Sequence, residues 1–270
     1  MSELLKKFKP IIGMIHLPPL PGSPAYQGQP VEKIVDQAVQ EAVSLVEGGI
    51  DAVLVENFND YPYVIENTSR PTIIALSVVA YEVKKHVDVP VGINILFNDA
   101  INEFYVAWTL GLDFIRVEGF IDTAFTDLGI IQPLSAKLLR LRAKYGGNNI
   151  AILADVQGKH TSIIPTRPLV DSVRDAFERG RADAVVLTGE RTGEPVNLAT
   201  LRAVREKFPN ARIFLGSGLT AETVSTLLTL ADGGIVGTYF KKDGKVHNPI
   251  DIHRVRNFMQ AVKELRERKI

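Results

Sequence analysis

Short apolar runs alternate with helix-like segments along the chain, and this alternation constrains the fold more than any other feature of the sequence. The apolar runs are residues 11–17, 52–56, 91–95, 114–118, 150–155, 184–187, 212–218 and 233–239. Between them, apolar residues recur at helical spacing over residues 31–47, 72–86, 100–110, 133–145, 168–179 and 198–208. Strands that alternate with helices build a parallel sheet, and eight such units close it into a (β/α)8 barrel, the TIM-barrel fold.

A doubly wound open sheet is the alternative to a barrel. That class carries a glycine-rich phosphate turn after its first strand, whereas here the first apolar run is followed by the proline-rich residues 18–24. A barrel takes about 250 residues, and the 270 residues contain no linker, charge block or low-complexity segment. We therefore predict one barrel domain over residues 1–270, with a glycine-rich connection at residues 188–195.

Charge and composition exclude several classes of function. The 31 basic and 31 acidic side chains cancel, which argues against a nucleic-acid partner. The absence of cysteine rules out disulfides, thiolate nucleophiles and cysteine-ligated metals, and it agrees with a cytoplasmic location. No apolar run approaches the roughly 18 residues of a membrane span, so we expect no transmembrane segment. For the face formed by Leu4, Leu5 and Phe8 we favour a leader helix packed under the barrel over contact with lipid.

Polar side chains close most of the predicted strands, at the barrel end where active sites of this fold lie. They are His16, Glu56, Asn57, Asn94, Arg116, Glu118, Asp155 and Thr188. From these we take His16, Glu56, Asn94, Arg116, Glu118 and Asp155 as catalytic candidates. Asp155 is the favoured general acid or base, and Glu118 is second.

A purely structural role is the alternative for each of these side chains. Arg116 could be a buried ion-pair partner of Glu56 or Glu118, and His16 could hydrogen-bond a loop carbonyl. Packing alone favours apolar residues in barrel layers, and so many polar groups at one end would be costly to bury without a ligand. The convergence of these polar side chains at one end of the barrel therefore favours a functional site over a purely structural role.

No cofactor is predicted, and a bound divalent metal is the alternative. Nitrogen and oxygen ligands suited to such a cation are available from His16, Glu56, Glu118, Asp155 and His160. They form no compact ligand motif, and strand-end carboxylates are common without metals. The prediction for the site therefore contains no metal.

Glycines and hydroxyl residues follow the seventh and eighth predicted strands, where barrels of this class bind phosphate through backbone N–H groups. The predicted phosphate-binding residues are Gly216, Ser217, Gly218, Gly237 and Thr238. Lysines that follow the second of these loops, at positions 241, 242 and 245, would add positive charge. The alternative is that the glycines only permit tight turns. The predicted ligand is a phosphorylated small molecule.

The segment Ile-Gly-Met-Ile-His-Leu-Pro-Pro-Leu-Pro-Gly-Ser-Pro at residues 12–24 resembles the BtpA family. Supporting segments are residues 53–57, 92–94, 115–118, 154–155 and 216–218. The namesake of that family is implicated in photosystem I biogenesis, and its members include SgcQ-type proteins of sugar-metabolism clusters. The resemblance implies a TIM barrel related to the ribulose-phosphate-binding group, without implying one particular reaction.

Within that wider group, phosphoribosylanthranilate isomerase is the enzyme whose reaction comes nearest to what this resemblance implies. Its strand-five aspartate is matched by Asp155, but its other catalytic group is a cysteine at the end of strand one, where His16 stands here. That same activity is therefore not expected.

Two functions from different classes follow. The first is an isomerase or lyase that performs acid–base chemistry on a small phosphorylated sugar or nucleotide-like compound. The second is a non-catalytic assembly or biogenesis factor, peripheral to a membrane or bound to a partner protein. For either function we expect a homo-oligomer. Fold alone does not separate the two.

Overall fold

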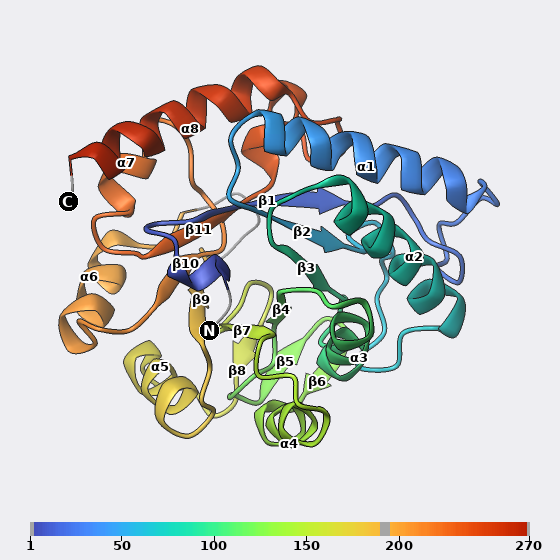
Figure 1. Cartoon of the computed structure of the whole chain (residues 1–270). Helices are drawn as coiled ribbons and strands as arrows, with labels where there is room; N and C mark the ends of the chain where they lie inside the picture. The colour runs from blue at the N-terminus through green and yellow to red at the C-terminus, as the bar shows by residue number, and fades with distance from the viewer. Residues whose placement is uncertain (1–2, 190–194, 269–270) are drawn as a thin grey trace.

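Eight parallel strands close into a barrel in the computed structural model, which describes residues 3–189 and 195–268 (Figure 1). The barrel strands are β1 (Ile11–His16), β2 (Ala52–Glu56), β3 (Val91–Asn94), β4 (Phe114–Val117), β7 (Ala151–Asp155), β9 (Ala184–Leu187), β10 (Ile213–Leu215) and β11 (Gly233–Val236). The first and last strands pair in parallel, with Ile11 beside Gly234, and this pairing closes the ring. The predicted TIM-barrel fold is confirmed.

Helices surround the barrel (Figure 1). They are α1 (Val31–Glu47), α2 (Arg70–His86), α3 (Ala100–Leu110), α4 (Ser135–Tyr145), α5 (Leu169–Glu178), α6 (Leu198–Lys207), α7 (Val224–Leu227) and α8 (Ile252–Glu267). The six predicted helices are present, with ends that differ by at most two residues. Helix α2 begins earlier than predicted because the Ser69 hydroxyl caps it by accepting from the Thr72 N–H. No helix in the described ranges is both long and apolar enough to span a membrane.

Part of the chain that was predicted as loop forms a small second sheet. Strands β5 (Ala124–Thr126), β6 (Gly129–Ile131) and β8 (Ser162–Ile163) pair antiparallel, in the order β6, β5, β8. They belong to the connections that leave β4 and β7, so this sheet stands at the carboxyl end of the barrel. Of the predicted connection at residues 188–195, residues 190–194 lie outside the described residues.

The inside of the barrel is filled by apolar side chains below the polar strand ends. Phe114 and Phe214 are fully buried there, and a Cβ atom on Gly92 would lie only 2.3 Å from the Phe114 ring. Glycine at position 92 thus makes room for the large ring, as the close packing of protein interiors requires.

The opposite end of the barrel is closed by the start of the chain. Leu4 and Leu5, in a 3-10 helix (Glu3–Lys6), are buried against the same inner cluster as Phe114. In Figure 1 this segment lies over the middle of the barrel. The predicted packing under the barrel is present, although as a single 3-10 turn, and Phe8 stays exposed.

We expect Phe114→Ala to lower the free energy of unfolding by about 3–5 kcal/mol, because it removes a fully buried ring and leaves a cavity. Urea denaturation followed by circular dichroism measures this change. The control is Phe125→Ala on β5, where 55% of the residue is exposed and the cost should stay within about 0.5 kcal/mol. Equal losses in the two variants would contradict this account of the core.

Candidate active site

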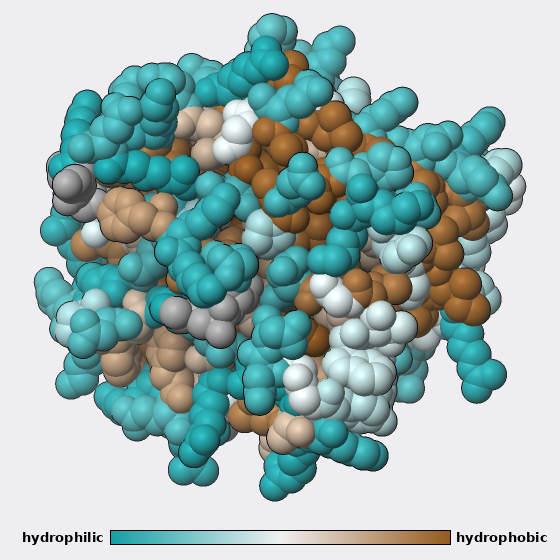
Figure 2. All heavy atoms as spheres, in the orientation of Figure 1, coloured by the Kyte–Doolittle hydropathy of each residue, from teal (hydrophilic) through white to brown (hydrophobic). Residues whose placement is uncertain are grey.

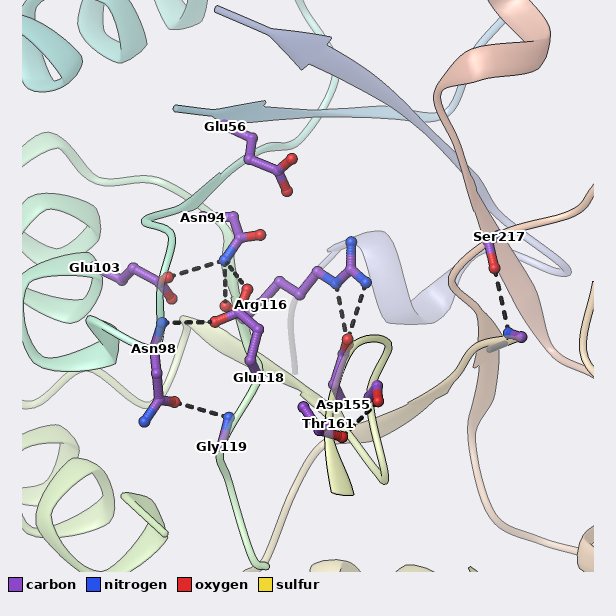
Figure 3. Close-up of polar contacts among 12 residues, drawn as sticks. Glu56, Asn94, Asn98, Glu103, Arg116, Glu118, Gly119, Asp155, Thr161 and Ser217 are labelled. Carbon is purple, nitrogen blue, oxygen red and sulfur yellow. Dashed lines mark hydrogen bonds and ion pairs between the residues drawn. The ribbon is translucent and has the colours of Figure 1, made fainter. Parts of the chain in front are cut away.

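The catalytic candidates from the sequence lie together at the carboxyl end of the barrel, and all of them except His16 are labelled in Figure 3. His16, Glu56 and Asn94 end three adjacent strands in register, so their positions follow from the pairing of β1, β2 and β3. The remaining candidates come from the ends of β4 and β7: Arg116, Glu118 and Asp155. Successive strand residues face opposite sides, so Met14 in the inner cluster places His16 on the inner face as well.

Arg116 and Asp155 form a bidentate ion pair. Arg116 Nε lies 3.0 Å from Asp155 Oδ1, and Arg116 Nη2 lies 2.9 Å from Asp155 Oδ2. Both side chains are buried. Burial lowers the pKa of Arg116, but the paired Asp155 outweighs that effect and raises it above its ordinary value. The guanidinium of Arg116 therefore stays protonated, and it pairs with Asp155 rather than with Glu56 or Glu118.

Glu118 is joined to a second carboxyl group through Asn94. Asn94 Nδ2 lies 2.7 Å from Glu118 Oε1 and 3.1 Å from Glu103 Oε1. Burial, and then the negative charge of Asp155, raise the pKa of Glu118 to about 8, against the opposing effects of Arg116 and Asn94. A carboxyl group in this state can give or take a proton near neutral pH.

Glu103 was not a candidate in the sequence because it lies within helix α3 rather than at a strand end. It is fully buried, and its Oε1 also accepts from the Ile95 N–H at 2.6 Å. Burial, and then the charge of Glu118, raise its pKa well above the ordinary value. Its only signal in the sequence is an acidic residue directly before the buried Phe104 of α3. Two carboxyl groups held this close favour sharing protons over both being ionised.

His16 is held as a neutral imidazole. Its ring stacks on Phe58, with centroids 4.3 Å apart and planes at 27°. Burial, and then the positive charge of Lys241, lower its pKa well below the ordinary value. Its Nε2 lies 3.8 Å from Glu56 Oε1, and its buried Nδ1 has no hydrogen-bond partner among the described residues. The alternative reading, a hydrogen bond to a loop carbonyl, is thus not observed at Nδ1.

The predicted phosphate-binding residues line one cavity of about 250 Å³, which we call the cup lobe. They are Gly216, Ser217, Gly218, Gly237 and Thr238. Within the described ranges, the backbone N–H groups of Gly218, Gly237 and Thr238 have no acceptor. Main-chain donors without partners are rare in folded proteins, and they suit an anion.

Glycine is required where the cup lobe meets the polar side chains. A Cβ atom on Gly237 would lie 2.8 Å from His16 Cε1. A Cβ atom on Gly216 would lie 2.6 Å from Thr188 Cγ2 and 3.3 Å from Arg116 Nη2. The close approach of backbone to side chains therefore joins the cup lobe to the candidate catalytic groups.

A second cavity of about 250 Å³, the carboxyl lobe, contains Asn94, Glu118 and Asp155. The two lobes share four lining residues, which are Glu56, Phe58, Arg116 and Lys159. The mouth of the barrel is thus divided into two lobes with a common wall, one lined by the glycine-rich loops after β10 and β11 and the other by carboxyl side chains.

Arg254 was not predicted as a site residue because it lies within α8 and does not follow a strand directly in the sequence. It lines the cup lobe, and its guanidinium lies 4.6 Å from the centroid of the Tyr239 ring. Lys241, expected to add charge to the cup lobe, is instead buried in an ion pair, with Nζ 2.7 Å from Glu41 Oε2. Arg254 therefore adds positive charge to the cup lobe, beside Arg116 and Lys159, from a helix that the sequence did not indicate.

The residues considered as alternative metal ligands are only partly brought together. His160 is exposed at the edge of the carboxyl lobe. In the part of the chain that the structure describes, no three His, Asp or Glu side chains form a group that could hold a metal ion.

Solved structures with similar folds include several enzymes. The N-(5'-phosphoribosyl)anthranilate isomerase of Pyrococcus furiosus has a TM-score of 0.58 at 15% identity, covering 95% of this chain and 99% of that one. The thiamine phosphate pyrophosphorylase of the same organism has a TM-score of 0.58 at 13% identity, covering 96% of each chain. At these identities the similarity shows the fold alone.

Sequence relatives are much closer. A protein of Methanocaldococcus jannaschii is 41% identical over 266 residues, covering 98% of this chain and 99% of the relative. The photosystem I biogenesis protein BtpA of Synechocystis is 36% identical over 264 residues, covering 98% of this chain and 91% of the relative. Residues 7–264 match the BtpA family as a whole. The resemblance noted in the sequence is thus confirmed, and the chain belongs to the BtpA family.

Proposed function

We propose that this protein is an acid–base enzyme, an isomerase or lyase, that acts on a small phosphorylated sugar or nucleotide-like compound. The observation that carries the proposal is the two-part cavity, with unpaired backbone N–H groups in the cup lobe and Glu118, of pKa about 8, in the carboxyl lobe. Two structural relatives carry phosphorylated compounds in their names, which supports this choice of ligand class.

In this proposal Glu118 moves the proton. Both oxygens of Asp155, the leading candidate from the sequence, already accept hydrogen bonds from Arg116, so they are less available to a ligand. Asp155 instead supplies the negative charge that helps to hold Glu118 protonated near neutral pH. We assign Arg116 to stabilising negative charge that develops on the ligand, because it lines both lobes.

The cup lobe would bind the phosphate group. Backbone N–H groups of Gly218, Gly237 and Thr238 would donate to its oxygens, and Arg254 would add a full positive charge. The substrate then extends past the shared wall, so that its reactive carbon lies beside Glu118. Binding energy from the phosphate would fix that carbon in place.

A role as a non-catalytic biogenesis factor is the second candidate, because a relative at 36% identity is the photosystem I biogenesis protein BtpA. Such a factor needs an exposed apolar surface. Helix α2 has one, with Ile74, Val78 and Tyr81 exposed at about one-turn spacing, and apolar surface is visible in this region in Figure 2. The predicted homo-oligomer would use the same kind of surface, and it stays a prediction.

The first test of the proposal uses inorganic phosphate as the probe. Gly218 has φ +74°, so Gly218→Ala strains the cup loop by about 1 kcal/mol or more and displaces its N–H groups. We expect phosphate affinity, measured by isothermal titration calorimetry, to fall at least about tenfold, a change of roughly 1.4 kcal/mol.

Gly111→Ala is the matched control for that measurement. Gly111 has φ +65° at the end of α3 and lies outside both lobes, so its replacement carries similar backbone strain without touching the cup lobe. Its phosphate affinity should equal that of the wild type. Absence of phosphate binding in the wild type, or equal loss in both variants, would contradict the cup lobe as an anion site.

A second test measures the titration of Glu118 through stability. Its pKa is raised in the folded state from 4.5 to about 8, so the folded state keeps a proton that the unfolded state releases. The stability from this group is complete below the unfolded pKa and is lost as pH rises to about 8. We expect Glu118→Gln to make the free energy of unfolding fall less steeply with pH, by at most about 1.4 kcal/mol per pH unit. Urea denaturation from pH 5 to 9 measures this slope.

Glu32→Gln, at an exposed position of α1, is the control, and its stability should follow the wild-type dependence on pH. Parallel curves for wild type and Glu118→Gln would show that Glu118 does not titrate in this range. Once a substrate is identified, for example by mass spectrometry of co-purified ligand, turnover of Glu118→Gln should be lower by roughly 10²–10⁴.

A further inference from the structure

Lys159 occupies the wall between the two lobes, and the acid–base proposal leaves it without a role. It lies on the loop after β7 and lines both the cup lobe and the carboxyl lobe. Its side chain is partly buried among groups of both charges, with Arg116, Asp155 and Glu56 near enough to affect its titration. A lysine at this position can reach a ligand that spans the two lobes.

The surroundings of the partly buried Lys159 differ from those of two buried lysines. Lys9 Nζ donates to the carbonyl oxygen of Ala231 at 3.0 Å and to a second backbone carbonyl. Lys241 Nζ is paired with Glu41 at 2.7 Å. In the described part of the chain, no acceptor lies within hydrogen-bond distance of Lys159 Nζ. The ammonium groups of Lys9 and Lys241 are thus bound by acceptors within the protein, whereas the amine of Lys159 is available to a ligand.

The pKa of Lys159 is lowered from its ordinary value, mainly because the side chain is partly buried. Burial, and then the positive charge of Arg116, lower its pKa, while Asp155 and Glu56 oppose that shift. A desolvated lysine beside another cation is one of the ways in which proteins activate an amine as a nucleophile.

We propose that Lys159 forms an imine with the carbonyl carbon of a phosphorylated aldehyde or ketone whose phosphate lies in the cup lobe. This inference rests on the proposed function and narrows its substrate class to carbonyl compounds. The amine nitrogen attacks the carbonyl carbon, and the oxygen takes a proton from Glu118 in the carboxyl lobe.

The remaining steps complete a dehydration. The nitrogen loses a proton, the hydroxyl group leaves as water after a second protonation, and the C=N bond forms with loss of the other N–H proton. The balance is amine plus carbonyl compound giving imine plus water, with no oxidation or reduction. The imine would then make the neighbouring C–H or C–C bond easier to break, which suits both an isomerase and a lyase.

Reduction with sodium borohydride tests the inference, because hydride converts an imine into a stable secondary amine. The wild-type protein is incubated with dihydroxyacetone phosphate or glyceraldehyde 3-phosphate, reduced, digested and analysed by mass spectrometry. We expect the peptide that contains Lys159 to gain the mass of the probe less one oxygen. Dihydroxyacetone, which lacks the phosphate, should label this lysine at least about tenfold less, since it does not engage the cup lobe.

Two variants separate the possible outcomes. Lys159→Arg keeps the positive charge without a nucleophilic amine, so it should lose the adduct and still bind inorganic phosphate. Lys245→Arg removes an exposed lysine near the cup lobe and should leave labelling of Lys159 unchanged.

Absence of labelling at Lys159 with both phosphorylated probes, or labelling no stronger than at Lys245, would overturn the imine. If Lys159→Arg still binds phosphate in that case, the acid–base proposal survives and Lys159 acts through its charge alone. If neither the wild type nor Lys159→Arg binds phosphate, the proposed function fails together with the imine.

Discussion

The ion pair between Arg116 and Asp155 sets the charge state of the groups around it. A buried guanidinium without its carboxylate, or a buried carboxylate without its guanidinium, would be an uncompensated charge. The two hydrogen bonds between them hold the pair together, and each member acts on its neighbours. Asp155 raises the pKa of Glu118, while Arg116 contributes to the lowered pKa values of Lys159 and His16. One fixed pair thus contributes to the shifted pKa values of three other side chains within the same small space.

The barrel could be predicted from the sequence because its signal is local and repeated. Each barrel strand reads as an apolar run, and helices α1 to α6 each have their own apolar spacing, so an error at one boundary does not change the topology. The meeting of six polar side chains could be predicted for the same reason, since a closed parallel barrel brings all its strand ends to one rim. The pairing of Arg116 with Asp155 was not predicted. The sequence indicated Glu56 or Glu118 as the partner, and it is the pairing of β4 with β7 that brings Asp155 beside Arg116.

Other features depend on contacts that no local pattern encodes. Glu103 and Arg254 lie on helices and reach the site only through the way α3 and α8 pack on the barrel. The strands β5, β6 and β8 have only two or three residues each, and β5 pairs across a long stretch of sequence with β8. Segments this short carry little periodicity, so their pairing is decided by the surrounding structure rather than by propensity.

Closure of the barrel through β1 and β11 also fixes when the fold can be completed during synthesis. Ile11 has no partner on one side until Gly234 has left the ribosome, and Leu4 and Leu5 have no complete surface to bury against until Ile235 is in place. Chains grow at roughly 5–20 residues per second, so the edge of β1 that pairs with β11 has no partner for at least about 10 seconds after β1 is made. Such an edge invites pairing with other chains. The last strand made is therefore the one that protects the first, and a chain truncated before β11 would expose both an unpaired strand and its apolar leader.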